Sequence, residues 1–180
     1  NYTISYATGD IVVGKAPLSA IAASKIKVYG DTNPALSFTY SGFVNGDTYE
    51  DLTLEPTVAT TVTTTTPAGL HEDVILVSGG TDDNYEYNYV PGDFTITAKP
   101  IVITADADQR KDFGDTDPVF TYTCNPALIT GDGFTGALSR AAGENIGTYA
   151  YTMGTLTAGS NYSLSLSTAA PIPTFTIGKR

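Results

Sequence analysis

Few residues of this chain have side chains suited to catalysis. It contains one histidine, His71, and one cysteine, Cys124. His71 is followed by Glu72 and Asp73, which are residue types that bind metals. Because successive residues of an extended chain point to opposite faces, these three side chains cannot easily converge on one ion. We interpret the segment as a solvated turn, and a single histidine with a single cysteine gives no well-founded Ser–His–Asp or Cys–His arrangement.

Paired carboxylates occur at Glu50–Asp51, at Asp82–Asp83, and at Asp106 with Asp108. A hydrolase holds such a pair in an apolar cleft lined by aromatic residues, and none of these pairs has that setting. Calcium binding at a domain junction, by Asp82, Asp83, Asp106 and Asp108, is a hypothesis, with exposed turn acids as the simpler interpretation. No loop of EF-hand type is present. We predict no enzyme, and we assign no catalytic, cofactor-binding or metal-binding residue.

The elements that would position any site occur in two copies. Residues 27–34 return as residues 111–118, with a basic residue, an aromatic residue, Gly, Asp, Thr and Pro in register. The spacing from Gly30 to Gly114 is 84 residues. A period of this length predicts two small domains in tandem. Glycine here predicts a backbone geometry closed to other residues, and the following Asp31 and Asp115 are expected to cap the turn with their carboxylates.

Strand patterns dominate both copies. Residues 36–40 and 120–124 alternate with period two, which predicts strands with one buried face, and Cys124 is read there as a small buried hydrophobe. Further strands are expected at 56–62 and 73–79 in the first copy, and the threonine run 60–66 is read as strand in preference to an O-glycosylated patch. Residues 47–52 predict one helical turn with Asp47 as its N-cap.

An Asn-Tyr pattern that predicts a β-hairpin occurs three times, at 1–14, 84–97 and 161–177. The tyrosine stripe of the second occurrence, Tyr85, Tyr87 and Tyr89, is read as core in preference to a sugar-binding platform. We therefore expect 1–14 to be the closing hairpin of a preceding repeat, followed by repeats at 15–98 and 99–180. Short proline-marked joints at 15–18 and 98–101 predict domains placed end to end as a stiff rod.

The net charge of −10 makes nucleic acid and anionic membranes poor partners. The acidity favours solubility and repulsion between neighbouring copies. No run of apolar residues is long enough to span a membrane. The chain begins inside a strand pattern, which suggests a fragment of a longer protein.

Four motifs together resemble the MBG repeat domains of bacterial surface adhesins. They lie at residues 27–34, 41–47, 138–149 and 84–97, and the resemblance covers residues 15–179. The first copy departs from the family pattern at 63–73. It is similar to a second variant of the family, whose closing segment has the pattern seen here at residues 77–85. The resemblance implies small β-rich modules, β-grasp-like with at most one short helix each; an immunoglobulin-like β-sandwich is the alternative. It also implies an extracellular location at the bacterial cell surface and no cofactor.

We therefore expect structural stalk repeats of a large secreted or surface-attached bacterial adhesin that project a distal binding region in cell adhesion. The partners would be neighbouring repeats of the same chain. The alternative is a repeat-borne binding module for host or environmental glycans or surfaces. Exposed aromatic residues in the loops, such as Phe43, Tyr49 or Phe134, would favour that alternative.

Overall fold

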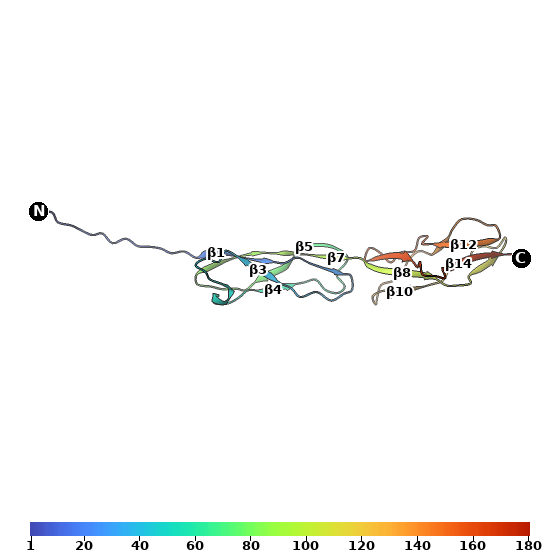
Figure 1. Cartoon of the computed structure of the whole chain (residues 1–180), viewed down its shortest axis with the longest axis horizontal. Helices are drawn as coiled ribbons and strands as arrows, with labels where there is room; N and C mark the ends of the chain where they lie inside the picture. The colour runs from blue at the N-terminus through green and yellow to red at the C-terminus, as the bar shows by residue number, and fades with distance from the viewer. The chain divides into compact units, whose positions relative to one another are not determined.

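The computed structural model describes all residues, 1–180, and the fold is mainly β with one short 3-10 helix and no α-helix. The chain forms two compact units. The first contains residues 1–25, 34–62 and 71–94, and the second contains residues 26–33, 63–70 and 95–180. The second unit therefore includes the aromatic-Gly-Asp turn of the first sequence copy. Figure 1 shows strands along the chain from β1 to β14.

The first sequence copy builds two small mixed sheets. The first has the order β3-β1-β6, with β1 antiparallel to β3 and parallel to β6. The second has the order β2-β7-β5-β4. The strands are β1 (Ala16–Ala22), β2 (Lys25–Val28), β3 (Phe38–Ser41), β4 (Thr57–Thr60), β5 (Gly69–Ser78), β6 (Tyr85–Val90) and β7 (Gly92–Thr97).

The second sequence copy repeats this topology. Its sheets have the orders β10-β8-β13 and β11-β12-β14-β9, and β8 again pairs in parallel with the penultimate strand, β13. The strands are β8 (Lys99–Ala105), β9 (Arg110–Asp112), β10 (Tyr122–Asn125), β11 (Ser139–Arg140), β12 (Gly147–Thr152), β13 (Tyr162–Leu166) and β14 (Thr174–Gly178). The predicted fold class and its duplication are confirmed.

Each copy has its own core, formed by alternate residues of its first and last strands. Leu18 of β1 and Phe94 of β7 are fully buried in the first copy, as are Ile101 of β8 and Phe175 of β14 in the second. Period-two alternation places these side chains on one face of each strand, and the opposite face stays accessible. In the first copy, β3 begins at Phe38, inside the predicted segment 36–40.

The predicted closing hairpin at 84–97 is wrong. Its two strands exist, but β6 lies beside β1 in one sheet and β7 lies in the other. Pro91 sits between them and cannot donate a backbone hydrogen bond, so the chain changes sheets there. Period-two alternation marks a strand but does not identify its partner. Residues 1–15 contain no strand (Figure 1), in keeping with the marginal stability of an isolated two-stranded hairpin in water.

Three local predictions also need correction. The threonine run is strand only up to Thr60, because the chain turns at 64–66, where Thr66 Oγ1 accepts a hydrogen bond from Thr63 N. His71 lies within β5 and not in a turn. The short helix is a 3-10 turn at Tyr49–Asp51 whose N-cap is Thr48, since the Thr48 and Asp51 side chains form a reciprocal capping box. The Asp47 carboxylate instead accepts a hydrogen bond from the Tyr85 hydroxyl.

Candidate functional site

The aromatic-Gly-Asp turn has the backbone geometry that its glycines predict. Gly30 has φ of 85° and Gly114 has φ of 93°, in the region that favours glycine. Backbone hydrogen bonds close each turn, from Asp31 N to Val28 O and from Asp115 N to Asp112 O. The predicted carboxylate caps are wrong, because main-chain groups already satisfy the turn. The Asp31 carboxylate instead lies 4.0 Å from Lys99 Nζ.

The basic residue that opens the motif is buried in both copies. In the first, Lys27 Nζ donates to Asp31 O at 3.1 Å, to Asn33 Oδ1 at 2.8 Å and to Thr63 O at 2.6 Å. Burial lowers the pKa of Lys27, against the opposing attraction of Asp31. These three oxygen acceptors replace the water contacts that the ammonium group loses on burial. The same bonds hold the turn to the neighbouring loop at Thr63.

In the second copy, the equivalent Lys111 belongs to a four-residue ion network. Its Nζ lies 2.8 Å from Asp117 Oδ1 and 2.5 Å from Glu144 Oε2. Arg140 binds the same two carboxylates, with Nε 2.7 Å from Asp117 Oδ2 and Nη2 2.7 Å from Glu144 Oε1. The guanidinium also lies over the ring of Phe175, 5.3 Å from its centroid. Two cations and two carboxylates therefore fix the turn to residues 140–144.

This network shifts the titration of its members in the expected directions. Hydrogen bonds from Arg140 lower the pKa of Asp117, and those from Lys111 lower the pKa of Glu144. Hydrogen bonds to Asp117, and then to Glu144, raise the pKa of Lys111. Since each group stays charged near neutral pH, the network acts as a structural clamp and provides no group poised for proton transfer.

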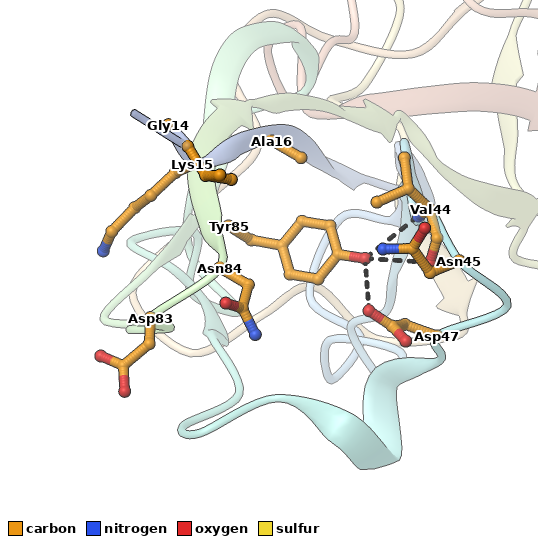
Figure 2. A pocket seen from close by; sticks show the side chains of 10 residues that line it. Gly14, Lys15, Ala16, Val44, Asn45, Asp47, Asp83, Asn84 and Tyr85 are labelled. Carbon is orange, nitrogen blue, oxygen red and sulfur yellow. Dashed lines mark hydrogen bonds between the residues drawn. The ribbon is translucent and has the colours of Figure 1, made fainter. Parts of the chain in front are cut away.

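A second feature shared by the copies is a tyrosine bonded to the aspartate of the Gly-Asp loop. In the first unit, Tyr85 Oη donates to Asp47 Oδ2 at 2.8 Å and accepts from Val44 N at 3.0 Å (Figure 2). A cavity of about 450 Å³ borders this tyrosine. Its lining residues are Val13, Gly14, Lys15, Ala16, Val44, Asn45, Asp47, Asp83, Asn84 and Tyr85.

In the second unit, the equivalent tyrosine has an additional neighbour. Tyr162 Oη donates to Asp132 Oδ2 at 2.5 Å and accepts from Ile129 N at 2.9 Å, as in the first unit. Here Tyr29 also donates to Asp132 Oδ2, at 3.0 Å, and its ring packs edge-on against Tyr162 with centroids 5.5 Å apart. Burial, followed by the bond to Asp132, raises the pKa of Tyr162 to about 12.

Asp82, one of the four acidic residues of the calcium hypothesis, already binds backbone donors. The Asp82 carboxylate accepts hydrogen bonds from Thr53 N at 2.9 Å, Asn84 N at 2.7 Å and Tyr85 N at 3.0 Å, and these bonds lower its pKa. Asp108 adopts a positive φ of 60° in the turn before β9. No group of three or more His, Cys, Asp or Glu residues is placed to hold a metal ion. Cys124 is half-buried on β10 and forms no disulfide.

Most of the aromatic residues considered for glycan binding pack inside their own unit. Phe43 contacts Tyr85 edge-on at 5.5 Å between centroids, and Phe134 contacts Tyr122 at 5.6 Å. Tyr49 is exposed. In the tyrosine stripe, Tyr85 is core as predicted, whereas Tyr87 and Tyr89 lie stacked at 5.7 Å, with Tyr89 37% exposed. The core interpretation therefore holds for one end of the stripe only.

Sequence reasoning missed the residues that hold the turn. The basic residue of the motif was visible at both Lys27 and Lys111, but its burial depends on loops far along the chain. Arg140 and Glu144 are four residues apart with opposite charges, but this spacing predicts an ion pair only on a helix, and the segment is not helical. Nothing in the spacing indicated that Asp132 would bind two tyrosines.

Fold and site together define a duplicated β-module whose polar clusters stabilise turns. The chain belongs to the family described as MBG domain (YGX type), whose model matches twice, over residues 18–95 and 101–170. Such repeats are typical of bacterial surface proteins, and no catalytic family matches. No curated protein and no solved structure matches the chain. None of its helical segments has the length and hydrophobicity to cross a membrane.

Proposed function

We propose that these repeats are stalk segments of a large bacterial surface adhesin, located outside the cell, which project a distal binding region. The observation that carries this proposal is the strand pairing at the ends of each copy. The first strand pairs in parallel with the penultimate strand, from Ala16 with Tyr85 to Ile21 with Val90 in the first copy, and from Lys99 with Tyr162 to Leu166 with Ile103 in the second.

This pairing resists tension along the chain. Tension pulls β1 toward its N-terminal end and pulls β6, through β7, toward its C-terminal end. Because the two strands are parallel, such a load shears the whole ladder, so its hydrogen bonds must break together and not one after another. The same argument applies to β8 and β13. A stalk that transmits force from a bound surface to a cell requires this property.

The joint between the copies is short. Only Ala98 separates the end of β7 at Thr97 from the start of β8 at Lys99. A connection of this length leaves little freedom compared with a Gly/Ser-rich linker. It supports the proposed role of a stiff spacer.

Replacing residues 16–178 in the full-length protein by a flexible Gly/Ser linker of equal length tests the proposal. We expect cells that carry the replaced protein to lose adhesion under flow while the purified distal region keeps its affinity. Unchanged adhesion under flow would contradict the stalk role.

A glycan-binding role is the second candidate, favoured by the stacked and partly exposed rings of Tyr87 and Tyr89. Stacked tyrosines offer a flat apolar face of the kind that sugars pack against. Glycan-array binding by the purified repeats that is lost in Tyr89→Ala would support this candidate. An array without binding would leave the stalk role as the better account.

A further inference from the structure

We propose that the cavity beside Tyr85 in the first unit is an acceptor site for an aromatic-Gly-Asp turn, and that Phe113 of a second copy of this chain enters it. The inference deepens the proposed stalk function, on which it rests, by assigning a contact between copies. The acceptor site comprises Val44, Asp47, Asn84 and Tyr85, and the donor turn is Phe113–Asp115.

The first argument is that both units contain the same acceptor framework. A backbone bond joins Asp47 N to Val44 O at 3.0 Å, and its counterpart joins Asp132 N to Ile129 O at 3.0 Å. The tyrosine hydroxyls then bond equivalent atoms in each framework, as described above. The asparagine before each tyrosine also matches, because Asn84 O accepts from Ala16 N and Asn161 O accepts from Lys99 N.

The second argument is that this framework already binds such a turn within the second unit. Tyr29 is 4% exposed there, with its ring on Tyr162 and its hydroxyl on Asp132. Next to it, Gly30 approaches Ile129 so closely that a Cβ atom would lie 2.5 Å from Ile129 Cδ1. The loop at 63–70 contacts the same framework, because Ala68 N donates a hydrogen bond to Asn161 Oδ1 at 2.9 Å.

The third argument is that the first unit has the site and the chain has a matching turn. Val44, Asp47, Asn84 and Tyr85 all line the cavity of about 450 Å³, with the Tyr85 hydroxyl directed at Asp47 (Figure 2). Phe113 occupies the position of Tyr29 in the motif, follows the same buried lysine and is 51% exposed. Burying an aromatic ring of this kind is favourable, because it removes a large apolar surface from water.

Charge predicts how this contact depends on salt. The cavity is lined by Asp47 and Asp83 together with Lys15, and the donor turn carries Asp115, with Asp112 directly before it. Each whole chain of 180 residues also has a net charge of −10. Repulsion between copies should therefore weaken the contact at low ionic strength, and added salt should strengthen it by screening.

An NMR titration with separated donor and acceptor tests the inference. The acceptor is the full chain labelled with ¹⁵N and carrying Phe113→Ala, so that it cannot donate. The unlabelled donor carries Phe113→Tyr, whose hydroxyl can reach Asp47 as Tyr29 reaches Asp132. At a donor concentration of up to about 2 mM, we expect saturable shifts of the Val44, Asp47 and Asn84 amides.

Matched donors decide the outcome. Wild-type Phe113 should bind about tenfold more weakly than Phe113→Tyr, because it lacks one hydrogen bond to a charged group. Phe113→Ala as donor should cause no such shifts. A control donor that carries both Phe113→Tyr and Val119→Ala, the latter at an exposed position of the same sequence copy, should bind as the Phe113→Tyr donor does. Equal shifts with the Tyr and Ala donors, or none with the Tyr donor, would overturn the inference. The stalk role is tested separately, under flow.

Discussion

Substitution of the two turn glycines separates backbone strain from steric contact. Both have positive φ, but their surroundings differ. A Cβ atom at Gly114 would have no neighbour within 4 Å, whereas one at Gly30 would lie 2.5 Å from Ile129 Cδ1. Gly114→Ala therefore measures strain alone, and Gly30→Ala measures strain plus a clash. Both glycines belong to the second unit, so one unfolding transition reports on both.

The magnitudes follow from these two contributions. Holding a residue with a Cβ at positive φ costs about 1–2 kcal/mol, so Gly114→Ala should lower the free energy of unfolding by that amount. Gly30→Ala should lower it by about 1 kcal/mol more, because Ile129 must move. Ile129→Val removes Cδ1, and in the double variant with Gly30→Ala it should recover most of the additional loss.

Urea unfolding followed by circular dichroism and tyrosine fluorescence gives these values, since the chain has 12 tyrosines and no tryptophan. Gly133→Ala is the matched control, because Gly133 has neither a positive φ nor a close neighbour, and its effect should stay within about 0.5 kcal/mol. Gly114→Ala equal to the control would refute the strain argument. Equal losses for Gly30→Ala and Gly114→Ala would refute the contact with Ile129.

Three other predictions follow from the bonded charged side chains. Lys27→Met removes the donor to three oxygen acceptors, and it should lower the free energy of unfolding in urea by about 2–4 kcal/mol. The control Lys25→Met loses one exposed bond to Ser37 and should lower it by less than about 0.5 kcal/mol. The pKa of Asp117 is lowered in the folded chain. Its contribution to stability is therefore present above the unfolded pKa of about 3.9 and is lost as the pH falls through the folded pKa. When the free energy of unfolding is measured at decreasing pH, Asp117→Asn should lose less of it than the wild type does. Calcium or a chelator should leave the melting temperature unchanged, because backbone donors already occupy the Asp82 carboxylate, and a calcium-dependent rise would contradict this.

The sequence predicted features that depend on local geometry. The positive φ of Gly30 and Gly114 follows from the type of turn, and period-two alternation located strands such as β3 and β10. The repeat predicted the duplication, which the family match and the sheet orders both show. In each case the physical cause lies within a few residues or in the comparison of two equivalent segments.

Features set by distant partners could not be predicted in this way. Alternation identified β6 and β7 but not the parallel pairing of β6 with β1, which lies almost 70 residues earlier in the chain. The carboxylate of Asp132 binds Tyr29 and Tyr162, whose hydroxyls come from segments far apart in sequence. In both copies a buried lysine holds the aromatic-Gly-Asp turn, and in the first copy the aromatic residue of the turn, Tyr29, also packs on Tyr162 and bonds Asp132.

Single-molecule force spectroscopy with two attachment geometries tests the stalk proposal most directly. Pulling on the two ends of the chain loads the β1–β6 and β8–β13 ladders in shear, and we predict two unfolding events at high force. Attachment at Lys15 and Asp83, the N-terminal sides of β1 and β6, should unzip the first ladder at a clearly lower force. In end-to-end pulling, Ser19→Pro within β1 should lower one of the two unfolding forces, and Thr3→Pro in the strand-free segment should not. Equal forces in the two geometries would contradict the proposed mechanical function.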